Sequence, residues 1–348
     1  MRNRSDAVVD TDERSKQEPE AGFAGVTRQY LAIFLSGLSV VLTAVSGILL
    51  SRHLGPATLG AYTAFFNVSI ILSRIINFGG QSYLIKTIPQ DNLSGNRTAA
   101  DVRTAKVLGV SVLITSVVVL SMIVLQESNM VTLANTYGMS ANEFYFLIGS
   151  AASISILSNT SAHWRASGHM LLGVTFDRIL YQIVFVLVVL SGGLKILSWD
   201  PRFVMTILQV ICAVLAVFCL FTPNAIQDGI RNQRTVSTPA RISIGAMGEL
   251  FAAVTLMTLN GYMLLPLLGF WLNSHDLGVV ALLLLFRSAL TFPGSLINAQ
   301  LGPEIAIATA AGDINKVRMA RMRNFNLAAL AAVVMGFVIV VLYKFLMH

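Results

Sequence analysis

Residues 203–222 read FVMTILQVICAVLAVFCLFT, a run of 20 residues without a charged side chain. A helix of about 20 residues, rising about 1.5 Å per residue, crosses the roughly 30 Å hydrocarbon core of a bilayer. Inside that core every backbone polar group must be bonded within the segment itself, which a helix achieves. The run therefore predicts a transmembrane helix.

Similar runs recur along the whole chain and predict an all-α, polytopic membrane protein of about nine transmembrane helices. The run at 143–162 is the weakest of them, because it is rich in Ser and other small residues. The nine predicted spans are 28–50, 59–79, 106–125, 143–162, 169–191, 203–222, 249–271, 277–299 and 325–346.

The overall composition agrees with a bilayer environment. Charged residues make up 12% of the chain and hydrophobic residues 55%, whereas soluble domains average about 25% and 45–50%. Too few polar side chains are present to cover a soluble surface. The net charge of +7 does not indicate a nucleic-acid partner, because the basic residues lie between the apolar runs.

No pattern of catalytic or metal-binding residues is present. The sequence contains no GxSxG, HExxH or CxxC motif and no glycine-rich phosphate loop, and its five histidines are scattered. Cys212 and Cys219 lie within one predicted span and are interpreted as small apolar residues, not as a disulfide. We therefore expect no enzyme activity, no cofactor and no metal.

The basic residues predict the orientation of the chain in the membrane. With a cytoplasmic N-terminus, 17 of the 24 Lys and Arg residues fall in inside segments, 4 in outside segments and 3 within spans. Cytoplasmic loops carry such an excess of positive charge. Residues 1–27 are then a disordered cytoplasmic tail, and the C-terminus lies outside.

A short internal repeat divides the chain. Leu59-Gly60 opens the second predicted span and Leu277-Gly278 opens the eighth, and the same offset carries Arg103 onto Arg321. Both copies run from outside to inside, as in parallel repeats related by an axis along the membrane normal. The predicted parts are a tail at 1–27, a six-helix lobe at 28–222, a cytoplasmic linker at 223–248 and a three-helix partial second lobe at 249–348.

The sequence motifs around the second predicted span resemble those of a known family. Leu49-Leu-Ser-Arg-His-Leu-Gly-Pro56 is followed by Leu59-Gly-Ala-Tyr62, Asn77-Phe-Gly-Gly80 and Ile88-Pro89. This pattern resembles the opening of polysaccharide and O-antigen flippases in the multidrug/oligosaccharidyl-lipid/polysaccharide (MOP) exporter superfamily. Leu277-Gly278, Pro303-Glu304 and Gly312-Asp313 look like the start of the family's second half.

The resemblance implies a flippase for lipid-linked oligosaccharides in the bacterial inner membrane, working by alternating access. Its partners would be a polyprenyl phosphate or pyrophosphate sugar, membrane lipids and other polysaccharide-assembly proteins. Members of the family have twelve to fourteen helices in two lobes around a central cavity. Nine predicted helices imply a second half that is shortened at the C-terminus.

Charged residues inside spans are the candidates for lining such a cavity, because a charge at a helix centre costs about 2.5–3.5 kcal/mol on insertion scales. Guanidinium groups suit phosphate, which they bind through two parallel hydrogen bonds. Asp177 is the ion-coupling candidate, or it pairs with an arginine of another helix; adjacent Arg178 points about 100° away on an α-helix. The substrate-binding candidates are Arg287, Arg74, Arg178, Asn159 and Asn260.

Several of these residues also have a purely structural interpretation. Arg74 and Arg178 are near enough to the cytoplasmic surface for their side chains to reach the headgroups. Ser155, Asn159 and His163 share one helix face, and small polar residues commonly pack membrane helices together. Asn159 and Asn260 therefore fit either packing or a cavity.

Two other function classes compete with the flippase. A membrane-bound polysaccharide polymerase or acyltransferase would need a large outside loop with catalytic residues, and the longest outside loop, 126–142, has no His, Arg or Lys. A drug/cation antiporter of the same superfamily would need acidic residues within its spans. Asp177 is the only deeply placed acid, so the anionic substrate is favoured.

The predicted topology can be tested with a reporter that is active only outside the cytoplasmic membrane. We expect a signal when the reporter is fused after Lys344 and none when it is fused after Arg234. The opposite pattern would show that the number of spans, and every loop assigned from it, is wrong.

Overall fold

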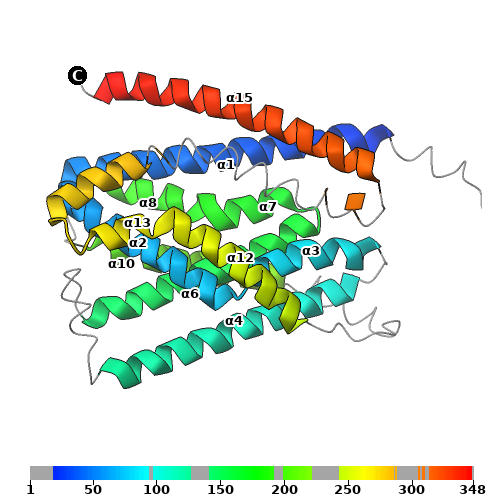
Figure 1. Ribbon diagram of the computed structural model, residues 1–348, viewed down its shortest axis with the longest axis horizontal. Coiled ribbons are helices and arrows are strands. Elements are labelled where there is room, and N and C mark those ends of the chain that lie inside the picture. The colour runs from blue at the N-terminus through cyan, green and yellow to red at the C-terminus, as the bar shows by residue number, and fades with distance from the viewer. Residues whose placement is uncertain are drawn as a thin grey trace, which may run out of the picture.

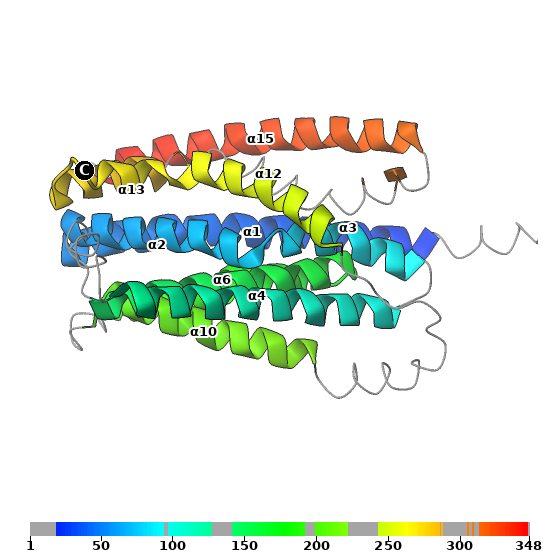
Figure 2. The same ribbon diagram turned by 60° about the horizontal axis from the view of Figure 1, so that its bottom comes forward.

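The computed structural model describes residues 19–93, 97–126, 141–191, 199–221, 243–285, 287, 305, 308–309 and 313–346, and its described elements are all helices. Figures 1 and 2 show that most of these helices run along one common direction. The predicted all-α, polytopic fold class is confirmed. The six-helix and three-helix division of the chain remains a prediction.

Six helices in the described part of the chain are long and apolar enough to cross a membrane. The long helices α1, α2, α4, α6 and α10 follow one another along the chain. Between α6 and α10, the elements α7, η1 and α8 together form the fifth predicted span. The elements are α1 Pro19–Leu54, α2 Pro56–Asn77, α3 Gly80–Leu93, α4 Arg97–Gln126, α6 Ala141–Ala166, α7 Met170–Val174, η1 Thr175–Ile179, α8 Leu180–Leu190, α10 Pro201–Leu220, α12 Ile244–Tyr262, α13 Leu264–Leu268 and α15 Ile314–Leu346. The six spans lie at Phe34–Leu54, Pro56–Asn77, Ala99–Ser121, Met170–Leu190, Pro201–Leu220 and Ile244–Tyr262.

The helix α6, which contains the weakest predicted span, lies at the centre of the N-terminal bundle, a name used here for α1–α10. It packs against α2, α3, α4, α7 and α10, and both views place it between α2 and α4 (Figures 1 and 2). From Leu157 to Ala166 every residue is buried. A helix enclosed by other helices needs small residues for close packing more than it needs apolar residues for lipid. This explains its low hydropathy.

Polar side chains of α6 are bonded to its neighbours. Asn77 of α2 donates to Asn159 Oδ1 at 3.0 Å, and Asn159 donates to Ser111 Oγ of α4 at 3.1 Å. One turn further on, His163 Nδ1 lies 2.9 Å from the hydroxyl of Thr104. Asn159 is completely buried, and its side-chain hydrogen bonds join three helices.

Two glycines of the family-like motifs, Gly55 and Gly79, lie between consecutive helices. Gly55 has φ 89° between α1 and α2, and Pro56 then occupies the first turn of α2. Phe78 and Gly79 are both left-handed, with φ 47° and 75°, and end α2 before α3 begins. Asn77 Oδ1 accepts a hydrogen bond from the backbone N–H of Gln81 at 2.9 Å, which caps α3.

Several elements differ from the sequence-based prediction, among them α4, which begins at Arg97 instead of residue 106. The first helix begins at Pro19 instead of residue 28, so residues 19–27 are helical and not part of a disordered tail. The helix α12 begins at Ile244 instead of residue 249. The helix α3 lies in a segment that the sequence predicts to be a loop. Residues 1–18 and most of the linker 223–248 lie outside the described residues.

Elements from the C-terminal part of the chain pack on α1 and α2. The helices α12 and α13 contact α2, and α12 also contacts α3. The helix at Ser274–Leu285 is apolar but short, and only the first part of the eighth predicted span belongs to the described residues. Its Leu285 lies where a side chain on Gly47 of α1 would be. The helix α15, which contains the ninth predicted span, lies along one edge of the bundle in both views (Figures 1 and 2).

The burial of Asn159 gives a stability prediction. Asn159→Ala removes the acceptor of Asn77 and the donor to Ser111, and an unsatisfied buried polar group costs about 1–3 kcal/mol. We expect a clearly lower midpoint of thermal unfolding for the protein in detergent. Ser116→Ala, on an exposed face of α4, is the control, and equal midpoints for the two variants would contradict the packing role.

Candidate substrate cavity

Three arginines and one aspartate converge near the end of α2 at which α3 begins. Arg74 comes from the last turn of α2, Arg165 from the last turn of α6, and Asp177 and Arg178 from η1. Asp177 Oδ2 lies 3.8 Å from Arg165 Nη2 and 3.6 Å from Arg178 Nε. Arg74 is close enough to interact electrostatically with both Asp177 and Arg178. We call these four residues the arginine cluster.

The cluster carries more positive than negative charge. It contains three guanidinium groups and a single carboxylate, and the side chains of Arg165 and Asp177 are only 6% and 12% exposed. Buried charges of one sign are stable only with counter-charges or hydrogen bonds. Nη2 of Arg165 and Nε of Arg74 are buried without a hydrogen-bond partner among the described residues. The site therefore has unused capacity to donate hydrogen bonds to an anion.

The backbone of η1 explains how adjacent residues share this site. Residues Thr175–Ile179 form one turn of π-helix between α7 and α8, a feature that often occurs at functional sites. On the α-helical geometry expected from the sequence, Asp177 and Arg178 are poor partners. In the structure both side chains contact each other, and Asp177 also reaches Arg165 on another helix.

A small pocket opens beside Arg74, between α2, α3 and α12. Arg74 donates to Gln81 Oε1 at 2.7 Å, and Thr255 Oγ1 is buried without a hydrogen-bond partner among the described residues. The pocket is lined by Arg74, Asn77, Gly79, Gln81, Ser82, Phe251, Val254 and Thr255. Its lining joins the N-terminal bundle to α12, and two of its polar groups, Nε of Arg74 and the hydroxyl of Thr255, have no hydrogen-bond partner among the described residues.

Gly79 permits this close approach of α12. A side chain on Gly79 would overlap the carbonyl oxygen of Met247 and would lie 2.9 Å from the backbone nitrogen of Phe251. The left-handed φ of 75° also favours glycine at this position. The phenyl ring of Phe78 stacks on Phe251, with ring centroids 5.0 Å apart. The motif Asn77-Phe-Gly-Gly80 thus builds one wall of the pocket.

The structure groups some of the sequence-predicted site residues and separates others. Arg74, Arg178 and Asp177 belong to the arginine cluster, whereas Asn159 lies in the packing network of α6. Asn260 is exposed on α12. Arg287 is exposed two residues after Leu285, and the contacts described for the cluster do not include it. The roles of all five binding candidates remain predictions.

Arg165 is the cluster member that the sequence analysis did not select. The predicted topology places it in a short cytoplasmic loop after the fourth span, yet it is the last basic residue of α6 and is 7% exposed. The sequence does contain a pattern that indicates its burial. Ser161 and Arg165 are four residues apart, so they share one face of α6 and continue its small, polar surface. The guanidinium Nε donates to the Ser161 carbonyl at 3.3 Å.

Another ion pair joins α3 to α4. Arg103 Nε lies 2.7 Å from Asp91 Oδ2, and Arg103 Nη1 donates to the hydroxyl of Tyr83 at 3.0 Å. Burial raises the pKa of the Asp91 carboxyl, and the charge of Arg103 opposes this shift. The pair fixes α3 beside α4 at the end of the bundle that contains the arginine cluster.

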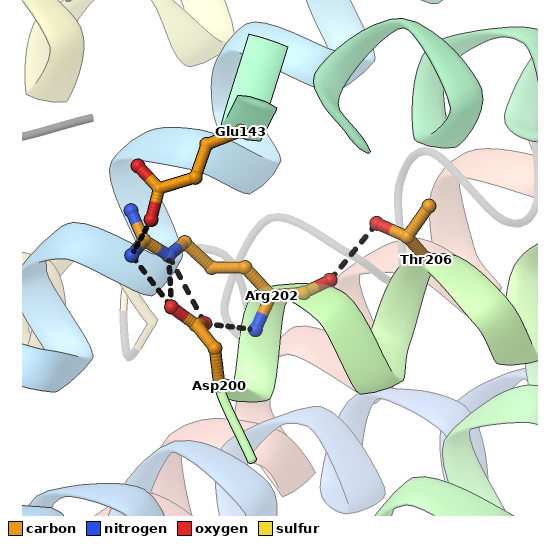
Figure 3. A network of polar contacts seen from close by, with 4 residues as sticks. All are labelled: Glu143, Asp200, Arg202 and Thr206. Carbon is orange, nitrogen blue, oxygen red and sulfur yellow. Dashed lines mark hydrogen bonds and ion pairs between the residues drawn. The ribbon is translucent and has the colours of Figure 1, made fainter. Parts of the chain in front are cut away.

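A separate network of charges joins the first turn of α6 to the first turn of α10, at the end of α6 away from Arg165 (Figure 3). Arg202 Nη2 lies 2.6 Å from both Glu143 Oε1 and Asp200 Oδ2. Asp200 also accepts from the backbone N–H of Arg202 at 2.7 Å and so caps α10. The cation has two carboxylate partners, so this network joins two helix ends and leaves no excess positive charge for a ligand.

The described residues contain no group of three His, Cys, Asp or Glu side chains that could hold a metal ion. Cys212 is buried and Cys219 is exposed, and neither forms a disulfide.

Together these features define a polytopic helical membrane protein with a polar, positively charged site between helices. No family model matches the chain, and no curated protein sequence matches it. Similar folds do occur among solved structures of MATE transporters, one of them described as a member of the MOP superfamily.

The MATE multidrug transporter DinF-BH, solved as a complex, aligns with a TM-score of 0.61 and 15% identity, over 96% of this chain and 74% of that one. An outward-facing multidrug resistance MATE family transporter of the MOP superfamily aligns with a TM-score of 0.56 and 16% identity, over 92% and 73%. A MATE protein in the straight conformation aligns with a TM-score of 0.55 and 15% identity, over 88% and 70%. The chain therefore has the MATE fold.

The pairing of Asp177 with Arg165 predicts a specific pattern of stabilities. Asp177→Asn leaves Arg165 buried without its counter-charge, and breaking a buried pair costs up to about 3–5 kcal/mol. We expect a lower midpoint of thermal unfolding in detergent. The double variant Arg165→Met/Asp177→Leu, which removes both charges, should recover part of the loss.

Asp276→Asn, at an aspartate with a 56% exposed side chain, is the matched control and should leave the midpoint unchanged. The single variants Arg165→Met and Asp177→Leu complete the comparison: a double variant whose loss equals the sum of these two single losses would show that Asp177 and Arg165 do not interact.

Proposed function

We propose that the protein is a transporter that moves lipid-linked oligosaccharides across the bacterial inner membrane by alternating access. The observation that carries this proposal is the arginine cluster, in which two guanidinium groups pair with one carboxylate and a third, that of Arg74, lines a small pocket. A polyprenyl phosphate or pyrophosphate sugar presents an anionic head to such a site. The MATE fold supports transport as the class of activity.

The chemistry of the cluster suits a phosphate. Guanidinium groups bind phosphate oxygens through two parallel, charge-assisted hydrogen bonds, which are roughly twice as strong as neutral ones. Nε of Arg74 and Nη2 of Arg165 have no hydrogen-bond partner among the described residues. A phosphate entering the pocket would accept from Nε of Arg74 and offset the excess positive charge of the cluster.

A drug/cation antiporter is the second candidate, because two of the similar folds are named as multidrug transporters. In that case Asp177 would hold the cation or a coupling proton. The two arginines within 4 Å of Asp177 compete with any cation for its carboxylate. This makes an anionic substrate the better match. No described feature supports the alternative of a membrane-bound polymerase or acyltransferase.

The distribution of Lys and Arg residues supports a cytoplasmic N-terminus. With that orientation the arginine cluster would lie toward the cytoplasmic face. Membrane lipids and other polysaccharide-assembly proteins are the further partners that we propose.

The proposal is tested with purified protein in proteoliposomes. Arg74→Gln removes the guanidinium beside the pocket, and we expect the flipping rate of a fluorescent polyprenyl-pyrophosphate oligosaccharide to fall by about tenfold or more. Arg52→Gln, at an exposed arginine near the opposite end of α2, is the control and should flip at the parent rate.

The same vesicles measure the efflux of a fluorescent organic cation. Efflux that depends on Asp177, together with no flipping of the lipid-linked sugar, would establish the antiporter and reject the flippase. Flipping that is unaffected by Arg74→Gln would show that the arginine cluster is structural.

A further inference from the structure

The two copies of the sequence repeat touch each other through equivalent residues. Gly60 lies near the start of α2 and Gly278 near the start of the helix at Ser274–Leu285. A Cβ atom on Gly60 would lie 2.8 Å from the backbone nitrogen and 3.1 Å from the Cα of Gly278. Both glycines are buried, as are the neighbouring Leu59 and Leu277, which are 1% and 6% exposed.

The contact is reciprocal in the way that a two-fold axis requires. The offset that relates Gly60 to Gly278 also relates Pro56 to Ser274. A Cβ on Gly60 would lie 3.0 Å from the carbonyl oxygen of Ser274, and a Cβ on Gly278 would overlap the carbonyl oxygen of Pro56. In a two-fold contact residue i of one copy meets residue j of the other, and j meets i. The pseudo-two-fold axis therefore passes between these two helix starts.

The position of the axis gives the contact a meaning for transport. In parallel-repeat transporters the axis runs along the membrane normal and the substrate site lies at the repeat interface. Residues that touch across the axis therefore lie between the two halves, on the route that a substrate would take. Apolar packing continues around them, because Leu59, Leu277 and Ala281 belong to one buried cluster with Leu50 and Leu265.

We propose that the Gly60–Gly278 contact is the closure that seals the transport pathway at the end where α1 joins α2. The structure is the state closed at that end. Opening the pathway there requires α2 and the helix at Ser274–Leu285 to separate at this contact. The inference rests on the alternating-access part of the proposed function, but it does not depend on the identity of the substrate.

Glycine is required at both positions because the opposing atoms belong to the backbone. A flexible side chain could turn away from an added methyl group, whereas the carbonyls of Pro56 and Ser274 are fixed by their helices. A larger residue at either glycine must push the two helices apart. Substitution should therefore favour the state that is open at this end, in proportion to the size of the new side chain.

The closure is tested by measuring the distance between two spin labels in the full chain. Ala57→Cys and His275→Cys flank the contact, and both parent residues are exposed. The labels are attached in a background of Cys212→Ala and Cys219→Ala, and pulsed dipolar spectroscopy in nanodiscs gives the distance distribution. We expect a population with a short distance in the parent. Gly60→Leu and Gly278→Leu should each lower the ratio of short to long distances by roughly tenfold or more, and Gly60→Ala by less.

Gly261→Leu is the matched control, because Gly261 lies in α12 with no atom within 4 Å of its added Cβ; this variant should keep the parent distribution. Gel filtration and circular dichroism establish which variants fold, and Gly60→Ala provides the test if the leucine variants do not. An unchanged distribution in the folded glycine variants, or a parent without a short-distance population, would overturn the closure.

A second measurement links the closure to transport. A reversible bifunctional thiol reagent that joins the two cysteines introduced by Ala57→Cys and His275→Cys should stop transport, and reduction should restore it. Transport that continues while the two cysteines are cross-linked would overturn the proposal. Because the spin-label distances need no substrate, a failure to flip lipid-linked sugars together with the expected distances would reject the substrate and leave the closure intact.

Discussion

The packing of α6 is the constraint on which the rest of the N-terminal bundle depends. A helix that packs against many other helices has little lipid-facing surface. It therefore needs small side chains for close packing, and its polar side chains must form hydrogen bonds with the neighbouring helices. Ser150 donates to Gln209 of α10 at 2.6 Å, and Asn159 joins α2 to α4. These bonds fix the positions of α2 and α4 relative to α6. The same packing places Arg165 beside η1, because Arg165 belongs to the last turn of α6 and η1 packs against α6.

Close contact between backbones also positions the helices that follow the N-terminal bundle. Gly79 allows α12 to lie against the turn after α2, and Gly60 allows the helix at Ser274–Leu285 to lie against the start of α2. Both glycines belong to α2 or its end, so α2 carries two of the close backbone contacts to the second part of the chain. A substitution that widens either contact would move whole helices, since no side chain there can absorb the change.

Apolar runs and basic loops were sufficient to predict the fold class, and in-span charges were sufficient to select Arg74, Asp177 and Arg178. The π-helical turn could not be predicted, because one inserted residue leaves the apolar pattern of a span almost unchanged. Arg165 was missed because hydropathy measures the preference for lipid, and α6 is surrounded by protein. The Leu-Gly repeat indicated an axis, but no sequence pattern states that Gly60 and Gly278 touch across it.

The positions along α2 relate the two functional proposals. Gly60 and Arg74 are separated by 14 residues, or about 21 Å of helix, so the closure and the arginine cluster lie toward opposite ends of one helix. A pathway sealed at Gly60 leaves the arginine end as the side from which an anionic head group reaches the pocket. Next to Thr255 in the pocket wall, Leu256 and Met257 of α12 are 68% and 77% exposed. A lipid-linked substrate could therefore place its head beside Arg74 while its hydrocarbon chain stays in the bilayer against α12, an arrangement that a soluble anion would not need.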